Sequence, residues 1–189
     1  MSEIWLVTGI PGAGKTTIAR LLAARFERSV HLGFDELQEW IVSGAVWPGD
    51  EPALEAQRQI DLSRRNLCLL ARSFSEGGFL PVIDYTANTR ATIADFAREL
   101  AGLNLNLAVL SPGKAVTSAR DAIREKSIRH KAERGISIAD RFGYLEDDLK
   151  AELSGIGLWI DNGNLTPEET VDSILRDRDR ARIDPLILR

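Results

Sequence analysis

The sequence predicts an α/β fold of three layers, in which helices cover both faces of a five-stranded parallel sheet and a helical lid is added. Short apolar runs rich in strand-forming residues alternate with longer helical patterns along the chain. A glycine-rich loop joins the first apolar run to the first helical pattern. The length of 189 residues suits one domain, which we expect to span residues 1–189.

The glycine-rich loop is Gly9–Thr17, with the sequence GIPGAGKTT, and it fits the pattern G-x-x-x-x-G-K-[ST]. The apolar run over residues 3–8 predicts a buried strand that ends at the loop. Apolar residues at helical spacing after the loop predict a helix over residues 15–26. Strand, loop and helix form the context that this motif needs, so the sequence predicts a phosphate-binding loop, here called the P-loop.

The residue types of the P-loop suit a nucleoside triphosphate. Its glycines let successive backbone N–H groups point inward toward an anion, and the positive end of the following helix adds to the attraction. Lys15 would reach the β- and γ-phosphates, and the Thr16 hydroxyl would ligate Mg²⁺. The candidate nucleotide contacts in the loop are Gly9, Pro11, Gly12, Ala13, Gly14, Lys15, Thr16 and Thr17.

Two acidic residues follow later predicted strands, on the side where open α/β sheets bind ligands. Asp35 follows a candidate strand over residues 29–32 and is a candidate base for a hydroxyl substrate. A helix cap or first-turn acid is the alternative for Asp35, and the spacing does not decide between the two. Asp84 ends the apolar run 79–84, the pattern of a Walker B element whose carboxylate holds Mg²⁺, usually through water.

Polar residues after two other predicted strands supply further candidate contacts. Three of them follow Asp84 and could touch a substrate: Thr86, Asn88 and Arg90. Capping of the next helix by Asn88 or Thr89 is the alternative. A turn follows the fifth predicted strand, residues 157–161, and Asn162 in this turn is a further candidate nucleotide contact.

A helix that begins near Ala115 runs into a basic stretch, which contains Arg120, Arg124, Lys126, Arg129, His130, Lys131 and Arg134. An isolated run of charges predicts a solvated helix face. Beside a P-loop, the same run favours a lid over about residues 120–142, whose arginines close over the triphosphate and neutralise charge during transfer. We favour the lid, with Arg120 and Arg124 as candidate catalytic residues, followed by a helix over residues 141–153.

Local signals predict the remaining elements. The proline- and glycine-containing loop 44–52 holds Trp47, either a packed anchor or one wall of a substrate pocket. A long helical pattern covers residues 53–76, and one of its arginines could face an anionic substrate. Alternating leucines over residues 103–110 predict a strand with one less buried face. At the start of the last helix, Thr166 and Glu169 predict a capping box, and Pro167 suits the first helical position.

Composition argues against several classes of function. The net charge of −4 offers no broad attraction to nucleic acid, and no apolar run approaches the ~18 residues of a membrane span. Cys68 is the only cysteine, and its leucine neighbours suggest a buried structural thiol. His31 and His130 lack metal-ligand spacing. The first residues already belong to the first predicted strand, so we expect no signal peptide and a cytoplasmic enzyme; nothing predicts its oligomeric state.

Together these features resemble the P-loop small-molecule kinases. The resemblance covers most of the chain and rests on the P-loop, Asp35, Asp84 and the arginine-bearing segment from Arg120. The chain looks most like the chloramphenicol phosphotransferase-like and zeta-toxin-like kinases, and it is also similar to shikimate and gluconate kinases. The Walker B element of these families often carries a second acid, whereas Tyr85 follows Asp84 here.

The resemblance implies a P-loop NTPase fold with strand order 2-3-1-4-5 and, in the absence of a guanine-reading motif, ATP as the nucleotide. It also implies that Asp35 orients or deprotonates the accepting hydroxyl. The expected reaction is transfer of the γ-phosphoryl of ATP to a hydroxyl of a small molecule, with Mg²⁺ held by Thr16 and Asp84. A nucleotide-dependent switch or binding module and a nucleic-acid end kinase are the alternatives; the acidic charge balance disfavours the latter.

Overall fold

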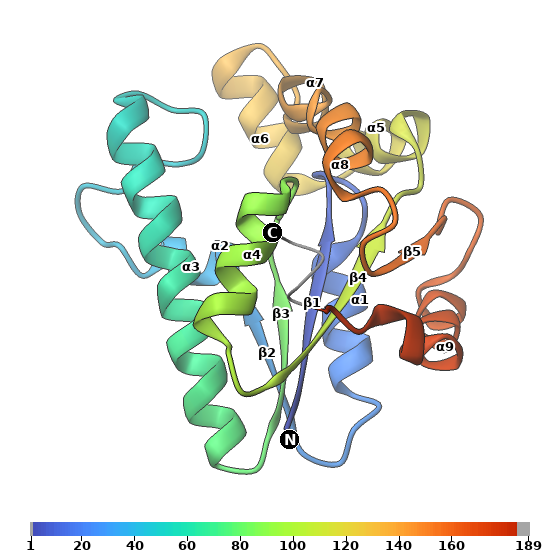
Figure 1. Ribbon diagram of the computed structural model, residues 1–189. Coiled ribbons are helices and arrows are strands. Elements are labelled where there is room, and N and C mark those ends of the chain that lie inside the picture. The colour runs from blue at the N-terminus through green and yellow to red at the C-terminus, as the bar shows by residue number, and fades with distance from the viewer. Residues whose placement is uncertain (1, 185–189) are drawn as a thin grey trace.

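A parallel sheet sets the position of the other elements (Figure 1). The computed structural model describes residues 2–184; residue 1 and residues 185–189, which belong to the predicted domain, lie outside the described residues. The strands follow the order β2-β3-β1-β4-β5, and all neighbours are parallel. They are β1 (Glu3–Gly9), β2 (Ser29–Gly33), β3 (Leu80–Asp84), β4 (Asn104–Leu110) and β5 (Leu158–Ile160). The predicted fold class and strand order are confirmed.

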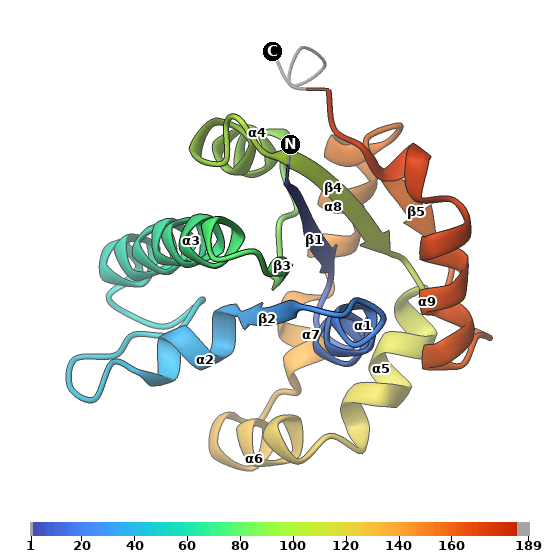
Figure 2. The ribbon, with the colours of Figure 1, turned by 90° about the horizontal axis from the view of Figure 1, so that it is seen from below.

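Helices cover both faces of this sheet, as Figure 2 shows from below. One face packs against α1 (Lys15–Ala23) and α9 (Pro167–Arg176). The other face packs against α3 (Ala53–Glu76), α4 (Arg90–Glu99) and α8 (Leu145–Leu153). The short helix α2 (Phe34–Glu39) follows β2 directly, and the 3₁₀ turn η1 (Arg178–Ala181) follows α9. The three predicted layers are therefore present.

A separate group of helices lies above the carboxyl ends of the strands in Figure 1. It consists of α5 (Lys114–Ala122), α6 (Glu125–Arg134) and α7 (Ile138–Phe142). Most of the basic stretch noted in the sequence falls in this group. The segment 120–142 is therefore helical and lies at the edge of the sheet that carries the P-loop.

The central strand β1 explains why the sheet needs cover on both faces. Successive side chains of a strand point to opposite faces. Ile4 and Leu6 enter the core beneath α3 and α4, whereas Trp5 and Val7 enter the core beneath α1 and α9. All four are fully buried, and burial of each such side chain contributes about 1.5–3 kcal/mol to folding.

The register of the strands brings the candidate site residues to one edge. Val7 pairs with Asp84, and Asp84 pairs in turn with Gly33 at the end of β2. Gly9, where the P-loop begins, pairs with Leu110 at the end of β4. The P-loop, the carboxylate of Asp84 and the start of α2 therefore meet at the same place.

The predicted less buried face of β4 is wrong, because the strand is buried on both faces. Asn106 lies on that face with 5% exposure, and its amide donates to the carboxylate of Glu3 at 2.8 Å. The chain after η1 runs alongside: Asn106 forms a β-bridge with Arg182, and the Ile183 N–H donates to the Leu105 carbonyl at 2.9 Å. The segment after η1 that covers this face is remote from β4 in the sequence, so the alternation of residues along β4 could not indicate it.

The continuous helix predicted through the basic stretch is also wrong, because the chain breaks between α5 and α6. Asp121, at the end of α5, is fully buried. Its carboxylate accepts hydrogen bonds from the Ser127 hydroxyl and from the Ala139 N–H, the latter at 2.8 Å. The buried charge therefore ties the beginnings of α6 and α7 to α5. The helix predicted over residues 141–153 is likewise divided into α7 and α8.

The capping box at the start of α9 is confirmed. The Thr166 hydroxyl accepts from the Glu169 N–H at 3.1 Å, and the Glu169 carboxylate accepts from the Thr166 N–H at 2.8 Å. We expect Thr166→Ala to lower the free energy of unfolding by about 1 kcal/mol, because one donor at the helix start loses its acceptor. Urea denaturation followed by circular dichroism measures the change. Thr166→Ser keeps the hydroxyl and should match the wild type; equal stability of the alanine variant would contradict the prediction.

Candidate functional site

The P-loop leaves β1 and turns into the first turn of α1. Gly12 and Gly14 have φ values of +84° and +95°, in the left-handed region that the turn requires. A Cβ on Gly12 would lie 2.6 Å from the carbonyl oxygen of Thr117, so the loop packs directly against α5. Gly14 is the N-cap of α1, whose first backbone N–H groups make this edge suitable for an anion. Among the other predicted loop contacts, Pro11 is half-buried and Thr17 is exposed.

Thr16 and Asp84 come together at the end of the loop. The Thr16 hydroxyl donates to Oδ2 of Asp84 at 2.5 Å, across the pairing of β1 with β3. A hydroxyl and a carboxylate are the hard oxygen ligands that Mg²⁺ prefers. The two residues that the sequence predicts as metal ligands therefore have the chemistry and the proximity that the ion needs.

Charges of both signs lie near Lys15. Its Nζ donates to the carbonyl of Ile10 at 3.3 Å. Burial lowers the pKa of Lys15, and attraction to Asp84 and Asp35 offsets only part of this effect. Burial alone would raise the pKa of Asp84, but His31, Lys15 and Thr16 outweigh it and hold the pKa of Asp84 below its usual value. Asp84 is therefore ionised at neutral pH.

His31 was not predicted as part of the site, yet it lies beside Asp84. Its Nε2 is 3.8 Å from Oδ2 of Asp84, which is longer than a hydrogen bond. Arg20 donates from Nε to Nδ1 of His31 at 3.5 Å. Nδ1 of His31 thus faces Arg20 and the Glu36 carboxylate, whereas Nε2 faces Asp84.

Asp35 is the second residue of α2, and Gly33 is the N-cap of this helix. The cap alternative for Asp35 is therefore wrong, although the residue does lie in the first helical turn. Its carboxylate forms an ion pair with Lys126 of α6, with Oδ2 and Nζ 2.5 Å apart. The same Nζ lies 4.4 Å from the centre of the Trp47 ring. Trp47 thus packs against a cation from the 120–142 segment.

Arg120 and Asn162 meet at the P-loop. The Arg120 guanidinium donates to the Asn162 carbonyl at 2.8 Å and to the Ala13 carbonyl at 3.4 Å. The Asn162 amide donates to the same Ala13 carbonyl at 3.0 Å. Arg124 is exposed at the N-cap of α6, and its charge acts on Lys15. The structure therefore gathers both predicted lid arginines and Asn162 around the loop.

Other candidate contacts have structural partners away from the P-loop. Thr89, and not Asn88, caps α4, with its hydroxyl accepting from the Thr92 N–H at 3.1 Å. The buried Arg64 of α3 pairs with Glu99 at 2.6 Å and with Asp95 at 3.4 Å. Arg64 therefore joins α3 to α4 and does not face an anionic substrate.

Sequence reasoning missed three contributions to this region: His31, the pairing of Lys126 with Asp35, and Asp50. The Asp50 carboxylate, in the loop before α3, receives two hydrogen bonds from Arg134 at 2.6 and 2.8 Å and pairs with Arg141 at 3.1 Å. Asp50 is more than 80 residues away from both arginines, so no local pattern could indicate these pairs.

Within residues 2–184, no cluster of three or more histidine, cysteine or carboxylate side chains could hold a metal. An ion at Thr16 and Asp84 would therefore complete its shell with phosphate oxygens or water. In that same part of the chain, no helix is both long and apolar enough to cross a membrane.

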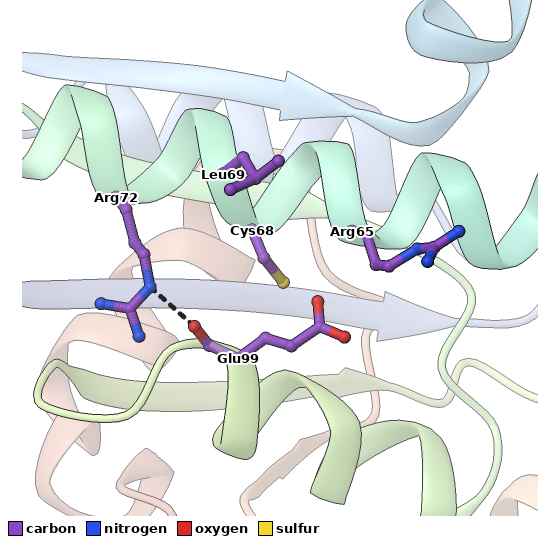
Figure 3. Close-up of a pocket in the computed structure, with 5 residues that line it drawn as sticks. All are labelled: Arg65, Cys68, Leu69, Arg72 and Glu99. Atoms are coloured by element: carbon purple, nitrogen blue, oxygen red, sulfur yellow. Dashed lines mark hydrogen bonds between the residues drawn. The ribbon is translucent and has the colours of Figure 1, made fainter.

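A cavity of about 340 Å³ lies between α3 and α4, away from the P-loop. Its lining residues are Arg65, Cys68, Leu69, Arg72 and Glu99. Figure 3 shows the Cys68 thiol directed from α3 toward the side chain of Glu99. Burial, with Glu99 nearby, raises the pKa of this thiol to about 12, which agrees with the structural role predicted for it.

Comparison with known proteins agrees with the fold described above. A family model described as an AAA domain, AAA_33, matches residues 4–141. The chain is similar to a sugar kinase from Janibacter sp. HTCC2649, with 19% identity, a TM-score of 0.62 and 96% of each chain covered. It is similar to the tunicamycin resistance protein of Deinococcus radiodurans, with 21% identity, a TM-score of 0.62, and 98% of this chain and 100% of that chain covered.

A gluconokinase from Sinorhizobium meliloti 1021 is similar as well, with 15% identity, a TM-score of 0.58, and 93% of this chain and 90% of that chain covered. At these identities the similarities show a shared fold. No curated protein matches the sequence.

The environment of Cys68 predicts that its thiol is unreactive in the folded protein. A thiol with a pKa of about 12 stays protonated at pH 8, and the thiolate is the reactive form. We expect no reaction with a thiol-specific disulfide reagent at pH 8 before unfolding, and one equivalent after unfolding in guanidinium chloride. Cys68→Ser, which lacks the thiol, sets the background absorbance. Rapid labelling of the folded protein would contradict the prediction.

Proposed function

Given that the chain belongs to the AAA_33 family of AAA domains, we propose that it is an ATP-dependent phosphotransferase acting on a hydroxyl of a small molecule. One observation carries the proposal: charges from three separate parts of the chain converge on the P-loop lysine. Lys15 is attracted by Asp84, the last residue of β3, and by Asp35, which follows β2. It is repelled by Arg124 and Lys126 from the 120–142 segment. An enzyme that only hydrolyses ATP has no organic acceptor, so it needs no acid such as Asp35 to take a proton from one.

In the proposed reaction the acceptor oxygen attacks the γ-phosphorus of ATP. A bond forms between this oxygen and phosphorus, and the bond from phosphorus to the β,γ-bridging oxygen breaks, so that ADP leaves with the electron pair. Asp35 accepts the hydroxyl proton, while Lys15 and the arginines Arg120 and Arg124 offset the charge of the moving phosphoryl. Positioning and charge neutralisation supply most of the catalysis in such transfers.

Thr16 and Asp84 would hold Mg²⁺, directly or through water. The ion would supply positive charge that offsets the negative charge of the triphosphate during transfer. The low pKa of Asp84 supports this role, because the carboxylate is available as a ligand at neutral pH. The remaining polar contacts to the nucleotide would come from the P-loop residues Gly9–Thr17 and from Asn162.

The segment 120–142 serves as the lid in this proposal. Arg120 already contacts the carbonyl of Ala13 in the P-loop, and α6 contacts α2 through Lys126 and Asp35. The segment therefore has partners on the nucleotide side and on the acceptor side. The names of two structural neighbours, a sugar kinase and a gluconokinase, support a small hydroxylated acceptor. ATP rather than GTP is expected from the resemblance alone.

A panel of sugars, sugar acids, sugar nucleotides and hydroxyl-bearing antibiotics, incubated with γ-labelled ATP and Mg²⁺, tests the proposal. The wild type should transfer label to at least one class of acceptor, and Lys15→Ala should transfer none. Release of labelled phosphate without transfer to any acceptor would favour a nucleotide-hydrolysing switch. Labelling of oligonucleotide 5′ ends, with a steep dependence on salt, would favour the end kinase instead.

Asp35→Asn should reduce transfer to the identified acceptor by at least roughly a hundredfold, because the amide cannot accept the hydroxyl proton. The affinity for ATP, measured by calorimetry without acceptor, should stay within about twofold, since the P-loop is unchanged. Glu39→Gln, at the exposed end of the same helix, is the matched control and should keep full activity. Full activity of Asp35→Asn would show that another group takes the proton.

Asp84→Asn should raise the Mg²⁺ concentration needed for half-maximal transfer by roughly tenfold or more, because a neutral amide is a weaker ligand for the ion. The measurement is the rate of transfer at saturating ATP over a series of Mg²⁺ concentrations, with folding checked by circular dichroism. Asp148→Asn, at an exposed position on α8, should leave the Mg²⁺ dependence unchanged. An unaltered Mg²⁺ dependence of Asp84→Asn would remove this residue from the metal site.

A further inference from the structure

Lys126 connects three segments that are far apart in the sequence. It belongs to the first turn of α6, pairs with Asp35 of α2, and lies over the ring of Trp47 in the loop before α3. We infer that Lys126 is a positioning residue of the transfer reaction, which holds one oxygen of the Asp35 carboxylate so that the other can face the acceptor hydroxyl. This inference rests on the proposed function.

The exposure of the pair argues against a purely structural role. The side chain of Lys126 is 39% exposed and that of Asp35 is 46% exposed. Ion pairs with this degree of exposure contribute little to folding stability, because water screens them and two long side chains lose freedom. Folding stability therefore does not explain why a lysine is paired with the candidate base Asp35.

The helix that carries Lys126 is nevertheless held firmly. At its beginning, the Ser127 hydroxyl donates to the buried carboxylate of Asp121. At its end, Arg134 makes two hydrogen bonds to Asp50, at 2.6 and 2.8 Å, and Arg141 of α7 pairs with the same carboxylate. The carboxylate of Asp50 is only 15% exposed, so these pairs are better shielded than the pair of Lys126. The position of Lys126 is thus determined by contacts other than its own.

The contact with Trp47 restricts the lysine further. Nζ lies 4.4 Å from the ring centre, within the range of a cation–π interaction. The ammonium is therefore directed by the ring as well as by the carboxylate. The loop that holds Trp47 is fixed in turn by the Gln59 side chain. Its amide oxygen accepts a hydrogen bond from the Val46 N–H at 2.8 Å, and its amide nitrogen donates to the Gly44 carbonyl at 2.8 Å.

The chemistry follows from the two oxygens of a carboxylate. Lys126 contacts Oδ2 of Asp35, and we assign Oδ1 to the acceptor hydroxyl. A donor that fixes the carboxylate plane also fixes the direction in which the second oxygen accepts a hydrogen bond. Because phosphoryl transfer depends mainly on in-line positioning of the acceptor, loss of this donor should slow the transfer more than it weakens nucleotide binding.

Steady-state kinetics with the identified acceptor test this inference. Lys126→Gln should lower kcat by roughly ten- to hundredfold, whereas KM for ATP should stay within about twofold. Lys126→Arg keeps a charged donor and should recover part of the rate. In the Asp35→Asn background, Lys126→Gln should cause little further loss, because both changes act through the same carboxylate. Lys114→Gln, which makes the same change at a lysine outside the segment 120–142 that pairs with the exposed Asp147, is the control and should behave as the wild type.

The outcomes distinguish a failure of the role of Lys126 from a failure of the proposed function. A wild-type kcat in Lys126→Gln, independent losses in the double variant, or a rise in KM for ATP that matches the fall in kcat would each overturn the role of Lys126 while the proposed function stands. Absence of transfer by the wild type to any acceptor would overturn the proposed function and this inference with it. Failure of Lys126→Arg to recover any activity, with folding intact, would also contradict a role that depends on the charged donor.

Discussion

Parallel pairing of β1 with β3 and β4 brings the carboxyl ends of the strands to one edge, and every part of the site depends on this constraint. The P-loop follows β1, Asp84 ends β3, and Asp35 follows β2 through the N-cap glycine of α2. The hydrogen bond from Thr16 to Asp84 then joins the loop to the neighbouring strand. Since backbone pairing sets these positions, the carboxylates and the lysine reach one another without any adjustment of long loops.

The segment 120–142 is connected to two sides of this edge by different kinds of contact. Beside the P-loop, Arg120 and Asn162 both donate to the carbonyl of Ala13. Beside α2, Asp50 binds two arginines and Lys126 pairs with Asp35. A movement of α6 would therefore also involve the loop before α3.

The family match assigns the chain to the AAA_33 family of AAA domains, and the expected P-loop NTPase fold is confirmed. The family model covers residues 4–141, and the sugar kinase, gluconokinase and resistance protein share the fold at low identity. The P-loop packs against the edge of the sheet through backbone geometry that depends on glycine. The surroundings of Asp35 are built by ion pairs and a cation–π contact between loops and helices, and such parts differ readily between proteins of one fold.

The sequence by itself determined the P-loop, the strand order implied by its resemblance, and the residues that follow each strand. These features depend on short motifs and on periodicity, which are local in the chain. Tertiary structure alone decided the rest: the cover over Asn106, the break in the basic helix at the buried Asp121, and the partners of Lys126 and Asp50. A charged residue in a sequence shows that an opposite charge or water must be near, but only folding brings residues 84 and 91 positions apart into contact.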